Sequence, residues 1–95
     1  MQKRKYTRKR VAFTSEMLFD KEEVGCSIVN ISAGGAKLKV TGKPENEYPQ
    51  TAVLDITPYG RFKVTLVWHS EEYLGVKFFD DPDKMTEVLI AMAVY

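Results

Sequence analysis

The sequence predicts an all-β protein, a six-stranded antiparallel β-barrel that ends in one short α-helix. Along several short segments, apolar residues alternate with polar ones, which is the period of a half-buried strand. Turn-forming residues separate these segments at short intervals, as they do in small barrels. Only the C-terminal segment carries a helical pattern of apolar residues, so the helix is expected to follow the barrel.

Six segments carry the strand pattern. The first follows the basic N-terminus at residues 11–14 and runs on toward Phe19; the others are expected at 24–30, 36–40, 52–57, 62–69 and 74–79, with a tight turn at 58–60. In the fifth segment, alternation places four apolar residues on one face and predicts that they all belong to the core: Phe62, Val64, Leu66 and Trp68. Closing the six strands into a barrel would also remove exposed sheet edges.

The C-terminal segment has the signals of a helix start. Asp81 is a candidate N-cap, and Pro82 suits the first helical position. The apolar residues that follow recur at helical spacing, at Met85, Val88, Leu89 and Met92. This stripe predicts that the helix covers one open end of the barrel.

Length and composition indicate a single cytoplasmic domain. The 95 residues are divided here into a basic arm (1–10), a barrel (11–80) and the helix (81–95). The longest apolar run, residues 88–94, is far shorter than a membrane span, and no apolar stretch follows the basic N-terminus as it would in a signal peptide. Cys26 is the only cysteine, so no internal disulfide forms, and we expect a reducing compartment and a small buried thiol.

The net charge of +1 conceals a strong asymmetry. Residues 1–10 hold six of the fourteen basic residues and no acidic one, whereas the other 85 residues carry a net charge of −5. A basic arm on a mildly acidic body is expected to attract an anion. With six like charges and little apolar surface, the arm is predicted to be mobile until it binds that anion.

Two short motifs carry the candidate chemistry. The arm contains Arg4-Lys-Tyr-Thr-Arg8, an R-x-x-x-R, and the junction of the second and third strands contains Asn30-Ile-Ser-Ala-Gly-Gly35, an N-x-S-x-x-G. Taken separately, the first is typical of a solvated tail and the second of a hairpin turn. Together they offer donors and acceptors that suit a small anion bearing guanine bases.

Each residue type has a physical reason to be there. Guanidinium groups match phosphate oxygens and the O6 and N7 acceptors of guanine. The Asn30 amide both donates and accepts, and Ser32 adds a hydroxyl. Gly34 and Gly35 are expected to permit positive φ and to let backbone amides approach a ligand.

The two motifs, about two dozen residues apart in a small all-β chain, resemble those of the PilZ family of cyclic di-GMP receptors. That family's signature is R-x-x-x-R followed by [D/N]-x-S-x-x-G, and this chain satisfies both parts. Residues 64–68 (VTLVW), residues 74–78 (LGVKF) and the helix after Asp-Pro also look like the family's last strands and helix. The resemblance covers nearly the whole chain.

The resemblance implies a role for each motif residue. Arg4 and Arg8 would grip phosphates and guanine edges of cyclic di-GMP, while Asn30 and Ser32 would hydrogen-bond one guanine and Gly35 would shape the turn. Asn30 stands where the family often has Asp. Asn lacks the negative charge that pairs best with the N–H donors of guanine, so we expect the same ligand but a different affinity. Three further candidates are Lys3, as a contact to a second ligand molecule, Gly34 in the turn, and Trp68, whose ring could stack on a guanine instead of packing in the core.

The resemblance thus implies a bacterial second-messenger receptor that acts as an adaptor for an unidentified protein effector, without a cofactor, a metal or catalysis. His69 is the only histidine and has no cysteine cluster around it, so no metal site is expected. Two alternatives remain open. One is a small nucleic-acid-binding barrel, which the acidic body disfavours, and the other is a PilZ-like protein-interaction module that binds no nucleotide.

Overall fold

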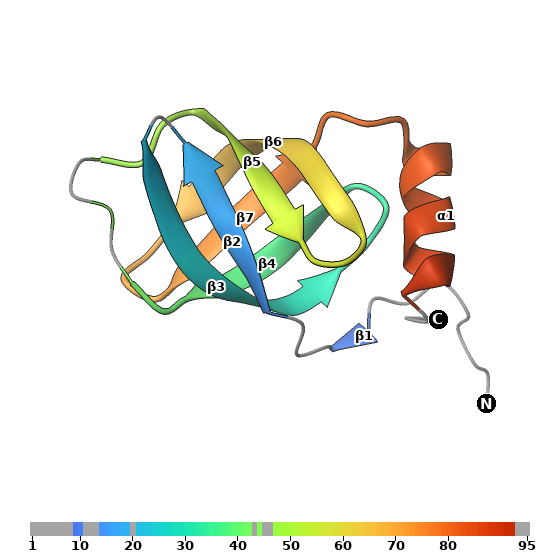
Figure 1. Ribbon diagram of the computed structural model, residues 1–95, viewed down its shortest axis with the longest axis horizontal. Helices are drawn as coiled ribbons and strands as arrows, with labels where there is room; N and C mark the ends of the chain where they lie inside the picture. The colour runs from blue at the N-terminus through green and yellow to red at the C-terminus, as the bar shows by residue number, and fades with distance from the viewer. Residues whose placement is uncertain (1–8, 11–13, 20, 43, 45–46, 93–95) are drawn as a thin grey trace.

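Six antiparallel strands close on themselves and enclose one hydrophobic core (Figure 1). The computed structural model describes residues 9–10, 14–19, 21–42, 44 and 47–92. The elements are β1 (Lys9–Arg10), β2 (Thr14–Phe19), β3 (Glu22–Ile31), β4 (Gly35–Val40), β5 (Thr51–Ile56), β6 (Gly60–His69), β7 (Tyr73–Phe78) and α1 (Pro82–Ala91). The predicted fold class, a six-stranded barrel followed by one helix, is confirmed.

The barrel is formed by β2 to β7, in the order β3-β2-β5-β6-β7-β4, and the pairing of β4 with β3 closes it. The short strand β1 lies outside this ring and pairs with the end of β3, Lys9 opposite Ile31 and Arg10 opposite Asn30. Since β4 already occupies one edge of β3 at these positions, β1 takes the other edge, the one that β2 uses further back along β3. The end of the basic arm is thereby tied to the barrel beside the N-x-S-x-x-G motif.

Alternation along the strands fills the interior. In β3, the inward positions Val24, Cys26 and Ile28 are all buried, and they alternate with partly exposed neighbours. Their counterparts in the other strands complete the core, among them Met17, Leu38, Leu54, Ile56, Val64 and Leu74. The inside of the barrel is therefore packed with side chains, and a ligand site must lie on its outer wall or at its rim.

The only cysteine belongs to this core, as predicted. Cys26 is 3 % exposed, and its sulfur lies 3.1 Å from the Ser15 hydroxyl. Burial raises the pKa of the Cys26 thiol, although the hydrogen bond with Ser15 works in the opposite direction. The thiol is thus neutral at physiological pH, and the side chain packs in the hydrophobic core.

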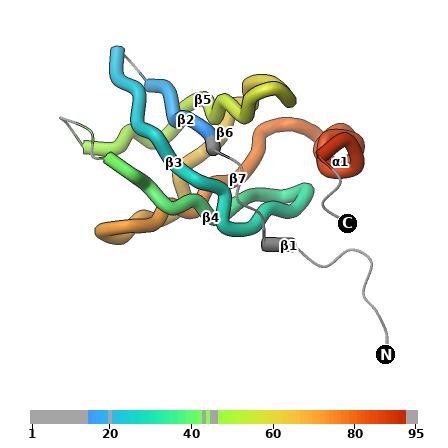
Figure 2. The backbone as a smooth tube through the Cα atoms, turned by 60° about the horizontal axis from the view of Figure 1, so that its bottom comes forward, coloured from blue at the N-terminus to red at the C-terminus, as the bar shows by residue number. Residues whose placement is uncertain are grey.

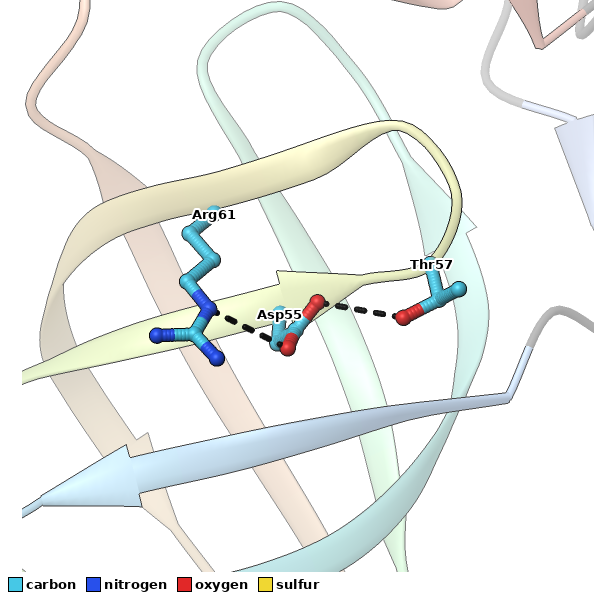
Figure 3. Close-up of polar contacts among 3 residues, drawn as sticks. All are labelled: Asp55, Thr57 and Arg61. Atoms are coloured by element: carbon cyan, nitrogen blue, oxygen red, sulfur yellow. Dashed lines mark hydrogen bonds and ion pairs between the residues drawn. The ribbon is translucent and has the colours of Figure 1, made fainter.

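The hairpin between β5 and β6 turns at the end of the barrel (Figure 3). The Tyr59 backbone N–H donates to the Ile56 carbonyl and closes a turn at residues 57–59, one residue before the predicted position. On the outer face, Asp55 accepts from the Thr57 hydroxyl and from Arg61 Nε, each at 3.3 Å. The Arg61 side chain is 69 % exposed, so this ion pair orders the hairpin surface more than it stabilises the fold.

Helix α1 covers one end of the barrel, as Figures 1 and 2 show. It starts as the sequence predicts, because Asp81 Oδ1 accepts from the Asp83 backbone N–H at 2.8 Å and Pro82 occupies the first turn. The predicted stripe faces the core: Met85, Leu89 and Met92 are buried and Val88 packs against them. In the part of the chain that the structure describes, no helix has the length and apolar character needed to span a bilayer.

This arrangement predicts a large difference between two apolar residues of one helix. Met85→Ala removes a fully buried side chain and should lower the free energy of unfolding by about 2–5 kcal/mol. Ile90→Ala, at a position that is 58 % exposed, is the matched control and should change it by less than about 0.5 kcal/mol. Urea unfolding measures both, and equal effects would mean that α1 does not close the barrel.

Candidate functional site

The N-x-S-x-x-G motif forms the turn between β3 and β4, and its serine holds the turn together. The Ser32 backbone N–H donates to the Gly35 carbonyl at 2.8 Å. The Ser32 hydroxyl lies 3.4 Å from that same carbonyl and 3.4 Å from the Gly34 backbone nitrogen, donating to the former and accepting from the latter. These two longer contacts leave the half-buried hydroxyl available to a better partner.

Gly35 is required by a close approach between strands. A Cβ atom at this position would fall on the carbonyl oxygen of Val76, a backbone atom of β7 that cannot move aside. At Gly34, by contrast, a Cβ would meet nothing within 4 Å. The turn does not use the positive φ that this glycine pair permits, since among the described glycines only Gly60 has such a φ, at +127°.

A β-bulge in β3 turns Asn30 toward the outside. Ile28 pairs with Leu38 and Asn30 pairs with Lys37, so Val29 is an extra residue with no partner position in β4. Strict alternation after the buried Ile28 would have pointed Asn30 into the core. The inserted residue instead places Asn30 on the outer face, and the next residue, Ile31, is buried again.

A second bulge in β6 has the same effect on Trp68. Leu66 pairs with Val76 and Trp68 pairs with Gly75, which leaves Val67 as the extra residue. The prediction that Trp68 lies in the core with Phe62 and Val64 is therefore wrong: Trp68 is 45 % exposed on the outer wall, and Leu66 is only half-buried. Val67 is 61 % exposed beside it.

The two bulges align a row of residues across four neighbouring strands. Each residue of the row pairs directly with the next, in the order Asn30, Lys37, Gly75 and Trp68. Directly opposed residues of neighbouring strands share a face, with Cβ atoms about 5 Å apart. The N-x-S-x-x-G motif and the tryptophan, far apart in sequence, therefore belong to one surface.

This surface is hollowed into a cavity of about 420 Å³. Ligand sites commonly have volumes of about 300–1,000 Å³. Its lining consists of Asn30, Ser32, Gly35, Ala36, Lys37, Val67, Trp68, Gly75 and Val76. The mixture offers an amide, a hydroxyl, an ammonium and an aromatic ring on a rigid barrel wall, which suits a planar polar ligand with negative charge.

Trp68 lies directly on the backbone of β7. Three atoms of its pyrrole ring stand over Gly75, in the space that a Cβ of any other residue would need. The indole can cover the strand in this way only because residue 75 is glycine. The ring is thereby fixed on the cavity wall and still almost half-exposed.

The predicted site residues fall into two groups. Asn30, Ser32, Gly35 and Trp68 come together in the cavity, and Gly34 lies in the adjoining turn without lining it. The candidates of the arm, Lys3, Arg4 and Arg8, lie outside the described residues, so their roles remain predictions, as does the mobility of the arm.

Sequence reasoning missed several residues of the cavity, chiefly Lys37, Val67 and Gly75. Lys37 and Gly75 stood in segments with clear alternation and looked like ordinary strand positions. The glycine inside the sixth strand segment was the one available signal, because a strand glycine often marks a close approach. Within the described part of the chain, no three side chains of metal-binding type gather into a possible metal site.

Comparison with known proteins agrees with this architecture. The family model for the PilZ domain matches residues 2–95, and the chain therefore belongs to the PilZ domain family, a family known to bind cyclic di-GMP. Among solved structures, the chain is similar in fold to an uncharacterized Legionella protein, Lpg0364, with a TM-score of 0.60 and 16 % sequence identity over 93 % of this chain and 91 % of that one. No curated protein matches the chain.

The two neighbouring glycines of the turn provide a matched test of its geometry. Gly35→Ala should lower the free energy of unfolding by about 1–3 kcal/mol, because the added methyl group collides with the Val76 carbonyl. Gly34→Ala adds the same methyl group into open space and should stay within about 0.5 kcal/mol of the wild type. Thermal unfolding measures both variants. A larger loss of stability in Gly34→Ala than in Gly35→Ala would contradict this geometry.

Proposed function

We propose that this protein is a receptor for cyclic di-GMP and that the outer wall of β3, β4, β7 and β6 holds one guanine of the ligand. The observation that carries the proposal is the aligned row from Asn30 to Trp68, with the Ser32 turn beside it, in a chain of the PilZ domain family. The row brings a hydrogen-bonding edge and a stacking platform together on one cavity wall.

The proposed recognition of guanine divides between these two ends. The amide of Asn30 and the hydroxyl of Ser32 supply donors and acceptors for a guanine edge, and both groups are half-buried. The Trp68 indole supplies a face for base stacking, which is worth about 1–3 kcal/mol per base in single-stranded nucleic-acid complexes. Because every base can stack, the preference for guanine over adenine would come from the Asn30–Ser32 side.

The phosphates are assigned to the basic arm. Strand β1 fixes the backbone of Lys9 opposite Ile31, one residue from Asn30. The segment that carries Arg4 and Arg8 comes directly before this strand in the sequence. The guanidinium groups of Arg4 and Arg8 are thus proposed to close over a ligand that lies on the wall, and this ordering of the arm would be the signal that a protein effector reads.

This proposal makes the protein an adaptor and not an enzyme. Among the residues that the structure describes, the cavity lining includes no carboxylate and no histidine, and the buried Cys26 lies inside the barrel. A nucleic-acid-binding barrel would need a basic track along the wall, whereas the described cavity lining contributes a single cation, Lys37. Binding of a small dinucleotide fits the cavity better than binding of a long strand.

Calorimetric titration tests the ligand directly. Cyclic di-GMP should bind with a clear preference over cyclic di-AMP and over a short single-stranded oligonucleotide, because adenine presents a different pattern of donors and acceptors to Asn30 and Ser32. Equal binding of all three, lost steeply at moderate salt, would instead identify a nucleic-acid-binding barrel.

Replacement of Arg8 tests the role of the arm. Arg8→Ala should abolish most binding yet change the free energy of unfolding by less than about 0.5 kcal/mol, because its proposed partner is the ligand. Arg61→Ala, an exposed arginine outside the cavity, is the matched control and should bind like the wild type. Unfolding of the barrel by Arg8→Ala would mean that the arm is structural and the assignment of Arg8 to the ligand is wrong.

The wall is tested by one substitution at each end of the row. Ser32→Ala should weaken binding about fivefold through one lost hydrogen bond, whereas Ser27→Ala, outside the cavity, should have no effect. Trp68→Ala should weaken it about 5- to 150-fold, and Trp68→Phe should recover part of the loss because a ring remains for stacking. If Trp68→Ala binds the ligand as tightly as the wild type, Trp68 does not stack on a base of the ligand.

A further inference from the structure

Lys37 occupies the middle of the aligned row without a role in the recognition described above. It pairs with Asn30 on one side and with Gly75 on the other, it is half-buried, and it lines the cavity. Among the described residues that line the cavity, it is the only charged one. The neighbouring outward residue of β4, Lys39, is exposed and does not line the cavity.

The charge of Lys37 is held by an aromatic ring. Its Nζ lies 4.6 Å from the centroid of the Tyr73 ring, in the range of a cation–π contact. Tyr73 precedes Gly75 by two residues on β7, so it is the diagonal neighbour of Lys37 across the strands. Among the described residues, the ion pairs join Arg61 to Asp55 and Lys84 to Asp80, and neither includes Lys37.

We propose that Lys37 is a phosphate-binding residue of the ligand site and contacts the ligand from the barrel wall. This inference rests on the proposed function. Neighbouring strands lie about 4.8 Å apart, and Gly75 is the one residue between Lys37 and Trp68 in the row. A base stacked on Trp68 would therefore carry its ribose and phosphate within reach of a lysine side chain on the adjacent strand.

The contact with Tyr73 keeps the ammonium available. A cation–π contact at a partly exposed site is weaker than a charge-assisted hydrogen bond to a phosphate oxygen, so a bound phosphate can draw Nζ off the ring. Lys37 approaches the phosphates from the barrel wall. It neutralises part of the phosphodiester charge and thereby selects for a charged ligand, which Asn30 and Ser32 do not do.

Three variants of β4 test the proposal by calorimetric titration with cyclic di-GMP at low and high sodium chloride. Lys37→Met keeps the aliphatic stem and removes the charge, and it should weaken binding about tenfold at low salt. It should also reduce the loss of affinity on adding salt, since one screened contact is gone. Lys37→Arg should recover most of the affinity, and Lys39→Met, the matched control on the same face of the strand, should bind like the wild type.

The outcomes separate this inference from the proposed function. If the wild type fails to bind cyclic di-GMP, the proposed function is wrong. If the wild type binds but Lys37→Met binds as tightly as Lys39→Met, the receptor function stands and the role of Lys37 is overturned. Thermal unfolding of Lys37→Met close to that of the wild type shows that a loss of affinity comes from the missing charge and not from damage to the barrel.

Discussion

One inserted residue in each of two strands decides which side chains face the solvent at the candidate site. Val29 in β3 and Val67 in β6 are both unpaired, and each reverses the alternation of the residue that follows it. Without them, Asn30 and Trp68 would point into a core that is already filled. With them, an amide and an indole lie on the same outer wall, at the two ends of a continuous row. The cavity, the proposed guanine contacts and the proposed role of Lys37 all depend on this pair of bulges.

The packed interior explains why the wall has to serve as the site. The inward side chains fill the barrel, and α1 covers one of its ends with Met85 and Leu89. The wall on which the cavity lies is rigid because β4 and β7, the two strands in its middle, are paired on both edges along the row. A rigid wall fixes the donors and the ring before a ligand arrives, which lowers the entropic cost of binding. Strand β1 adds the remaining constraint, since it ties the start of the described chain to the edge of β3 next to Asn30.

The sequence predicted most of the fold because period-two alternation and turn residues act locally. The six strand segments, the turn after Ile56 and the helix cap at Asp81 are all found close to the predicted positions. The prediction was wrong where alternation is broken. Trp68 was assigned to the core because an unbroken strand from Phe62 places it there, and nothing in residues 64–68 marks Val67 as an insertion.

Of the residues that line the cavity, local sequence patterns predicted chiefly those of the N-x-S-x-x-G motif. Asn30, Ser32 and Gly35 stand in a recognisable hairpin, and the structure places all three in the cavity. Gly35 was expected to shape the turn. In the structure, position 35 requires glycine because a Cβ there would collide with the carbonyl of Val76, on a strand that is distant in sequence. Lys37 could not be found from a local pattern, and Gly75 offered only the general signal of a strand glycine, since the importance of both comes from register across four strands.

The central claim is that the row between Asn30 and Trp68 is the surface that binds cyclic di-GMP. It is tested most directly by following the backbone amide and indole NMR signals of the uniformly labelled protein during titration with cyclic di-GMP. The account predicts that the largest shift changes occur at Asn30, Ser32, Gly35 and Lys37 and at the Trp68 indole N–H, with small changes on β2 and β5. Saturable changes centred on β2 and β5, or none along the row, would contradict it.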